Sequence, residues 1–175
     1  TIWGNNGRGI SSSEHNINRG PLTVTNSTLS GNSGGGIYCY GTLTVTNSTL
    51  SGNSAYDYGG GIHFFSRSST ATLNNTIVAG NAAPSEPDIY LASGTLTGSH
   101  NLIGDGSGQS SIVHGVDGNL VGTAESPIDP RLLRDPSDGG DGWGDDPDTP
   151  DIDESANDNY GDLHLLSDSP AVNAG

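Results

Sequence analysis

The stretch Leu22-Thr23-Val24-Thr25-Asn26-Ser27-Thr28-Leu29-Ser30-Gly31-Asn32-Ser33 decides the fold, because it recurs without a change at residues 43–54. The two copies are 21 residues apart, and a looser third copy occupies residues 71–81. Glycines and a short apolar segment follow the first two copies, as Gly34-Gly35-Gly36-Ile37 and Gly59-Gly60-Gly61-Ile62. Self-similarity at a period of about 20 to 50 residues is typical of repeat architectures. The fold class therefore follows from the repeat.

Apolar and polar residues alternate inside each copy, with Leu22 and Val24 flanked by threonines. This period of two, in a segment rich in Thr and Val, predicts β-strands. A unit of this size cannot bury its own apolar face, so we expect the units to stack as coils about 4.8 Å apart around one shared core. The predicted ladders of equivalent core residues are Leu22, Leu43 and Ala71; Val24, Val45 and Leu73; Leu29, Leu50 and Ile77; and Ile37, Ile62 and Ile89. The prediction is an all-β solenoid, a parallel β-helix of about four regular coils.

Asparagines recur at the predicted turns. A carboxamide both donates and accepts, so stacked asparagines can hydrogen-bond from coil to coil while tolerating a left-handed backbone. The predicted structural ladders are Asn26, Asn47 and Asn74, and Asn32, Asn53 and Asn81.

Composition limits the partners of the chain. It has 175 residues, 5 basic and 20 acidic, and its net charge of −15 disfavours nucleic acid and anionic membranes as partners. No apolar stretch approaches the roughly 20 residues of a membrane span, so we expect no direct membrane insertion. The single cysteine, Cys39, aligns with Phe64 and is predicted to be a buried core thiol. Because residue 1 falls inside a repeat, we expect the chain to be part of a larger protein.

An aromatic stripe is predicted on the outer surface of the coils. In Ile62-His63-Phe64-Phe65 the alternation places His63 and Phe65 outward. Aligning the coils places Tyr38 and Tyr90 beside His63, and Tyr40 beside Phe65. Such a stripe suits stacking on sugar rings or packing against a partner protein, and the alternative is that a lateral loop covers the rings.

No catalytic site is predicted in the regular coils. Residues 1–104 contain four carboxylates, Glu14, Asp57, Glu86 and Asp88, and none of them repeats at the coil spacing. Polysaccharide hydrolysis needs paired carboxylates facing one groove, and lyase chemistry needs a cation-binding cluster with a base. The sequence therefore favours a non-enzymatic role, and we assign no catalytic and no cofactor-binding residue.

The acidic residues are concentrated near the C-terminus, where 12 of the 20 lie between positions 135 and 168. Carboxylates spaced among Gly and Pro suit Ca²⁺, which takes six to eight oxygen ligands. The predicted ligands of a structural Ca²⁺ are Asp145, Asp146, Asp148, Asp151, Asp153 and Asp158. The alternative is a solvated acidic loop. The expected organisation is regular coils over 1–104, divergent coils over 105–134, an Asp-rich loop over 135–168 and a closing segment over 169–175.

Two families share these motifs. Leu29-x-x-Asn32 with Gly34-Gly35-Gly36-Ile37 resembles the FxxN and GGxI repeats of polymorphic outer-membrane and autotransporter passenger proteins, with Leu in place of Phe. Asn101-Leu102-Ile103-Gly104-Asp105 and the ending Ser169-Pro170-Ala171-Val172-Asn173-Ala174-Gly175 resemble choice-of-anchor Q domain proteins, although Asn173 stands where that family has Asp and 135–162 reads as an insertion. The resemblance implies a right-handed, pectate-lyase-like β-helix exported by a bacterium and held at its surface.

These observations predict a non-catalytic, structural or adhesive module that is secreted or displayed on a bacterial cell surface. Its expected partners are glycans or cell-surface components. The first alternative is a carbohydrate-binding or polysaccharide-degrading β-helix. The second is an extracellular fibre subunit that self-associates through its coil ends, because unpaired strand edges pair readily.

Overall fold

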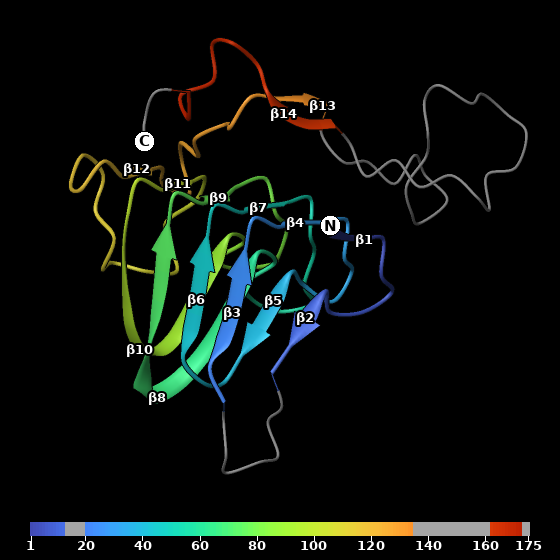
Figure 1. Ribbon diagram of the computed structural model, residues 1–175, viewed down its shortest axis with the longest axis vertical. Coiled ribbons are helices and arrows are strands. Elements are labelled where there is room, and N and C mark those ends of the chain that lie inside the picture. The colour runs from blue at the N-terminus through green and yellow to red at the C-terminus, as the bar shows by residue number, and fades with distance from the viewer. Residues whose placement is uncertain (13–19, 135–161, 173–175) are drawn as a thin grey trace, which may run out of the picture.

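The computed structural model describes residues 1–12, 20–134 and 162–172, and within them the chain winds into stacked coils (Figure 1). A six-stranded parallel sheet forms the first face of the solenoid. Its strands, in spatial order, are β1 (Ile2–Trp3), β4 (Thr28–Ser30), β7 (Thr49–Ser51), β9 (Ile77–Val78), β11 (Leu102–Ile103) and β12 (Leu120–Val121).

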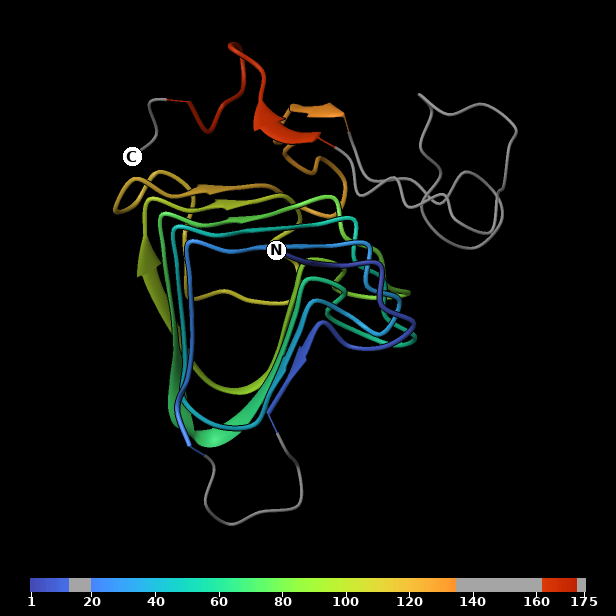
Figure 2. The same cartoon turned by 45° about the vertical axis from the view of Figure 1, so that its right-hand side comes forward.

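A second parallel sheet bends around a corner and supplies the other two faces. Its strands are β2 (Ile10–Ser11), β5 (Ile37–Cys39), β8 (Ile62–Asn74), β6 (Leu43–Thr46) and β3 (Leu22–Thr25), with β10 (Ile89–Ser99) paired to β8. The start of β8 pairs with β5 and its end pairs with β6. The second face therefore holds β2, β5 and the starts of β8 and β10, and the third face holds β3, β6 and their ends. Figure 2 shows the resulting three-sided coil, broad along the first face and narrow at the bend.

The prediction of an all-β, parallel β-helix is confirmed, and most predicted core ladders keep their register. Leu22 pairs with Leu43, and Leu43 with Ala71, while Val45 pairs with Leu73. The inward residues along these ladders are almost completely buried, including Leu43, Val45 and Leu73 at 0% exposure. One thin apolar core, shared by all coils, therefore replaces the thick core of an ordinary domain.

One predicted ladder was wrong by a single residue. Leu29 pairs with Leu50, but Leu50 pairs with Val78 and not with Ile77. Because successive side chains of a strand point to opposite sides, Ile77 faces outward and Val78 enters the core. The pattern was ambiguous there because both residues are apolar, whereas Thr49-Leu50 marks the inward residue clearly.

The outer side of the first face becomes apolar toward its C-terminal coils, where Leu102 faces outward next to inward Ile103 and yet is only 2% exposed. The C-terminal segment, which comprises residues 127–134 and 162–172, lies over this side of the sheet (Figure 2). The amide of Ile128 donates to the carbonyl of Gly104 at 2.9 Å, which docks the segment on the sheet. Its strands β13 (Leu132–Arg134) and β14 (Asp162–Leu165) pair antiparallel.

A left-handed residue turns the chain from the third face to the first in each coil. Asn26, Asn47 and Asn75 have φ of 49°, 50° and 49° at this corner. The Nδ2 group of Asn47 donates to Oδ1 of Asn26 at 3.1 Å, and that of Asn75 donates to Oδ1 of Asn47 at 2.9 Å. The predicted third member, Asn74, is therefore wrong. It pairs with Thr46 at the end of β8, and the neighbouring Asn75 takes the corner.

Residues 106–119 close the C-terminal end of the coil stack. Ile112, only 4% exposed, joins the core cluster from this loop. The Gln109 side chain fixes the loop, since its Oε1 accepts the amides of Ser111 and Ile112 and its Nε2 donates to the Ile112 carbonyl. None of the described residues forms a helix long and apolar enough to cross a membrane.

Candidate ligand-binding groove

A groove of about 810 Å³ lies along the second face of the solenoid, and its lining includes six Tyr or Phe side chains and His63. One wall consists of outward side chains of β5, β8 and β10, which stack in register as Tyr38, His63 and Tyr90. The rest of the lining comes from the turns at residues 6–8 and 33–35 and from the loop at residues 55–58, which precedes the glycine turn leading into β8. The groove therefore combines a rigid sheet with a lateral loop.

The predicted aromatic stripe is assembled as the sequence register indicates. The Tyr38 and His63 rings lie 4.4 Å apart, and His63 meets the edge of Tyr90 at 4.9 Å. Tyr40 and Phe65 lie 5.4 Å apart, and a hydrogen bond of 2.8 Å joins the hydroxyls of Tyr38 and Tyr40. These contacts fix the rings in place, and each of the five side chains remains partly exposed.

The lateral loop adds aromatic residues to the stripe. Tyr58 stacks on Tyr90 with centroids 4.5 Å apart and keeps 41% of its surface exposed. Tyr56, at the rim, is 91% exposed. Large exposed aromatic side chains beside a cavity are typical of binding sites for sugars or proteins. The predicted alternative, a loop that covers the stripe, holds only in part, because the loop lines the groove without filling it.

A cation lies on the aromatic array. The Arg8 guanidinium sits over the Tyr38 ring, with Cζ 3.4 Å from the centroid, and its Nη1 donates to Ser11 Oγ at 3.5 Å. Such a cation–π contact stabilises the ring orientation by about 0.5 to 2 kcal/mol. Arg8 and Asp57 thus give the groove one guanidinium and one carboxylate among its described lining residues.

Sequence reasoning missed Arg8, Tyr56 and Tyr58 as groove residues. The signal was present in the repeat, because residues 55–58 are an insertion between Ser54 and the glycine run relative to the preceding copy. Insertions in solenoids form loops on one face, often the binding face. The position of Arg8 had no comparable signal, since it depends on the path of the turn before β2.

The second predicted asparagine ladder lies at the corner between the first and second faces and is buried. The Nδ2 group of Asn32 donates to Oδ1 of Asn53 at 2.8 Å, and that of Asn53 donates to Oδ1 of Asn81 at 2.9 Å. The ladder begins one coil earlier than predicted, where Asn5 Nδ2 donates to Oδ1 of Asn32 at 2.6 Å. It holds the turns between the first face and the groove.

Asp88 ends this ladder and occupies the place of the turn glycine, since Gly36, Gly61 and Asp88 each precede the isoleucine that starts the second face. Its Oδ1 accepts from Nδ2 of Asn81 at 2.8 Å, and its Oδ2 accepts the amide of Asp105 at 2.7 Å. Burial raises the pKa of Asp88 to about 6, against the lowering effect of these hydrogen bonds.

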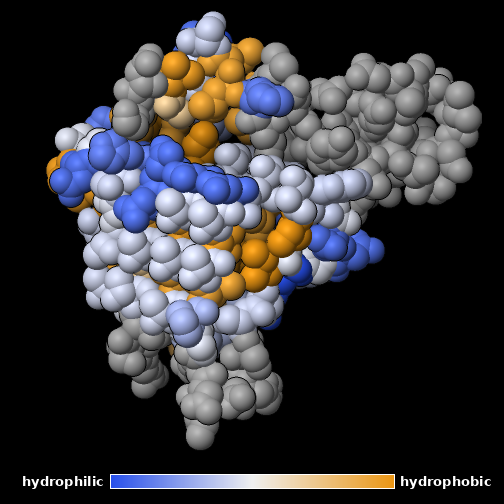
Figure 3. All heavy atoms as spheres, viewed as in Figure 1, coloured by the Kyte–Doolittle hydropathy of each residue, from blue (hydrophilic) through white to orange (hydrophobic). Residues whose placement is uncertain are grey.

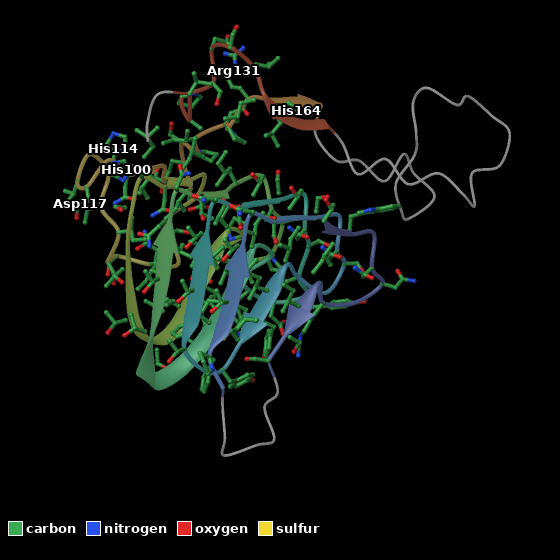
Figure 4. The ribbon with its side chains drawn as sticks, viewed as in Figure 1. His100, His114, Asp117, Arg131 and His164 are labelled. Atoms are coloured by element: carbon green, nitrogen blue, oxygen red, sulfur yellow. The ribbon has the colours of Figure 1, made fainter. Side chains whose placement is uncertain are left out.

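The single cysteine and three of the histidines lie away from the groove. Cys39 is a buried free thiol beside Phe64 in the core. His100 and His114 lie with Asp117 at the C-terminal end of the coils, and His164 lies on the C-terminal segment (Figure 4). Within the described ranges, no three His, Cys, Asp or Glu side chains are grouped to hold a metal ion. The six predicted Ca²⁺ ligands fall at 145–158, outside the described residues.

Comparison with known proteins agrees with this geometry. Residues 1–123 match the family model described as the right handed beta helix region, which covers every strand of the coil stack from β1 to β12. No curated protein and no solved structure matches the chain significantly. Because the match extends over more than half of the sequence, the chain belongs to the right-handed β-helix family.

Proposed function

We propose that this chain is a non-catalytic binding module of an extracellular or surface-displayed bacterial protein, and that its aromatic groove binds a glycan. The observation that carries the proposal is the continuous array from Tyr58 through Tyr90 and His63 to Tyr38 along a groove of about 810 Å³. The rings belong to successive coils, so they are spaced along the solenoid axis as a chain-like ligand would require.

The chemistry of the groove suits sugar rings. Pyranose faces carry C–H groups that pack on aromatic rings, and their hydroxyls hydrogen-bond to polar groups at the edges. Tyr58 lines the groove and keeps 41% of its surface exposed, and the Arg8 guanidinium supplies donors beside Tyr38. The array is held by the sheet before a ligand arrives, which lowers the entropic cost of binding.

The ionisable groups favour binding over bond cleavage. Glycoside hydrolysis requires two carboxyl groups flanking the scissile bond. Asp57 is the one carboxylate among the described residues that line the groove. A base for lyase chemistry would need a neighbouring cation-binding cluster, and the described part of the lining offers one carboxylate for it.

A glycan array probed with the full chain, followed by calorimetry on the best oligosaccharide, tests the proposal. We expect Tyr58→Ala to weaken binding roughly tenfold, because it removes one stacking surface worth about 1 to 2 kcal/mol. Trp3→Ala is the matched control, since Trp3 is 37% exposed on β1 and outside the groove lining. Loss of binding in both variants, or none in either, would contradict the assignment.

Product analysis tests the alternative that the chain degrades polysaccharides. Incubation of candidate polymers with the chain and Ca²⁺, followed by viscosity and reducing-end measurements, should show no depolymerisation. If the wild type lowers the viscosity and Tyr58→Ala does not, the chain is an enzyme that acts through this groove and not a binding module.

A structural Ca²⁺ at 145–158 remains a sequence-based proposal beside this function. Thermal unfolding of the full chain with Ca²⁺ and with a chelator tests it, because a ligand that binds the folded state raises the midpoint. Equal midpoints would leave the solvated acidic loop as the explanation. Surface display is tested separately, by protease treatment of intact cells that express the full-length protein.

A further inference from the structure

The third face of the solenoid carries a two-dimensional array of hydroxyl side chains on its outer side. Parallel pairing of β3, β6, β8 and β10 aligns the outward residues of successive coils in straight rows. The rows are Thr70 and Thr95; Thr23, Thr44, Thr72 and Thr97; and Thr25, Thr46, Asn74 and Ser99. All of these side chains are exposed or partly exposed.

This array carries no charge, although the chain has 25 charged residues and a net charge of −15. The strand segments that form it, at 22–25, 43–46, 70–74 and 95–99, contain no Asp, Glu, Lys or Arg. Figure 3 shows the area over these strands as a pale field of intermediate hydropathy, bordered above by a band of hydrophilic residues. The solvent-facing side of a sheet in an acidic extracellular protein ordinarily carries charged side chains.

The array has two regular repeats fixed by the backbone. Neighbouring coils are about 4.8 Å apart, and outward residues two positions apart along a strand are about 6.6 Å apart. Threonine has few χ1 rotamers, so its hydroxyl and methyl take a small set of positions relative to the backbone. Thr72 Oγ1 lies 3.4 Å from Thr97 Oγ1, so hydroxyls of adjacent coils also come within hydrogen-bond distance of each other.

We propose that this threonine array binds ice. Water oxygens on the prism face of hexagonal ice repeat at similar intervals in two perpendicular directions, so waters held by the hydroxyls can join that lattice. The methyl groups order the water between them, and the absence of charge avoids hydration shells that would disrupt it. Each contact is weak, but rigid rows bind together and the contacts add. The array lies on a different face from the aromatic groove, so the inference is independent of the glycan proposal.

Ice recrystallisation inhibition and thermal hysteresis of the full chain test the inference directly. We expect the wild-type chain to inhibit recrystallisation and to shape ice crystals. The double variant Thr44→Lys/Thr72→Lys places two charges in the central row. Its inhibitory concentration should be at least about tenfold higher than that of the wild type. Ser110→Lys, at an exposed position on the closing loop, is the control and should behave as the wild type.

Thermal melts followed by circular dichroism show whether the double variant loses inhibition because its array is changed or because it misfolds. If the double variant melts like the wild type and has lost inhibition, the array is the ice-binding surface. If wild type shows neither inhibition nor hysteresis, or if the double variant retains both, the inference is wrong. If the wild type sediments as a dimer and the double variant as a monomer, the array mediates self-association, and the ice-binding inference is wrong.

Discussion

The Nδ2 group of Asn81 donates to Oδ1 of Asp88 at 2.8 Å, and this bond terminates the buried asparagine ladder. Each earlier rung joins two carboxamides, which accept on one side and donate on the other. An ionised carboxylate only accepts hydrogen bonds, so Asp88 has no N–H group to donate to a further coil. Asp88 instead takes the amide of Asp105 at 2.7 Å and joins the last regular turn to the closing region.

The first prediction is that acid stabilises this junction. The folded-state pKa of Asp88 is raised from 3.8 to about 6, so the folded chain binds a proton more tightly than the unfolded chain does. Its stabilising contribution is complete below about pH 4 and is lost as the pH rises through about 6, with an amplitude on the order of 3 kcal/mol. Urea unfolding of wild type and Asp88→Asn between about pH 4 and pH 7 measures the difference.

Asp88→Asn cannot titrate, and its amide group would face the Asp105 amide that Oδ2 now accepts. We therefore expect the variant to be less stable than wild type at acid pH, and its own stability to vary less with pH than that of the wild type does. Parallel stability profiles for the two proteins would show that Asp88 does not carry the pH dependence.

The second prediction separates the buried asparagine ladder from the exposed one. Asn53 donates to Asn81 and to the Leu29 carbonyl and accepts from Asn32, all inside the protein. Asn53→Ala should cost about 3 kcal/mol or more, because it leaves buried partners unpaired. Asn47→Gly is the matched change in the exposed ladder and should cost less than about 1 kcal/mol, since Gly accepts its φ of 50°. Chemical denaturation compares them, and equal costs would refute the distinction.

Sequence periodicity was sufficient for the fold because identical copies must make identical contacts. Leu22-Thr23-Val24-Thr25 and its repeat at 43–46 specify strand, register and inward face together. Register became uncertain where two apolar or two amide residues adjoin. Ile77 and Asn74 were each misplaced by one position, because Val78 and Asn75 are equally suitable neighbours.

The groove could be predicted only in part, for a physical reason. Its sheet wall follows from strand register, so Tyr38, His63 and Tyr90 were placed beside one another from the sequence alone. Its loop wall depends on how residues 55–58 fold back over the second face, and an inserted loop has no repeat to set its path. The same argument applies to Asp88, whose role emerges only when the turn replaces glycine with a side chain.

The third prediction concerns Gly61, which precedes Ile62 at the start of the second face. A Cβ on Gly61 would lie 2.5 Å from the Asp88 carbonyl oxygen and 2.7 Å from Val78 Cγ1, closer than packed atoms approach. Gly61→Ala should therefore destabilise the chain by about 2 to 3 kcal/mol through overpacking. Gly7→Ala, where a Cβ would meet nothing within 4 Å, should stay within about 0.5 kcal/mol of wild type. Thermal melts measure both, and a tolerated Gly61→Ala would show that adjacent coils can separate.

The last prediction uses neighbouring residues on opposite sides of one strand. Leu102 faces outward beneath the C-terminal segment, whereas Ile103 faces the shared core. Ile103→Ser should lower the stability of the whole coil stack by about 3 kcal/mol or more, because it buries a hydroxyl and leaves a cavity. Leu102→Ser should instead loosen the C-terminal segment while the coils stay folded, since Leu102 lies outside the core cluster.

Limited proteolysis with mass spectrometry distinguishes these two outcomes. For Leu102→Ser we expect faster cleavage confined to the C-terminal segment, with the core strands as protected as in wild type. For Ile103→Ser we expect cleavage throughout the coils, following the fall in global stability. Equal fragment patterns would mean that the segment and the solenoid unfold as one unit. Confined cleavage would instead establish that the segment is a separate layer, held to the first face by the outward residues of β9, β11 and β12.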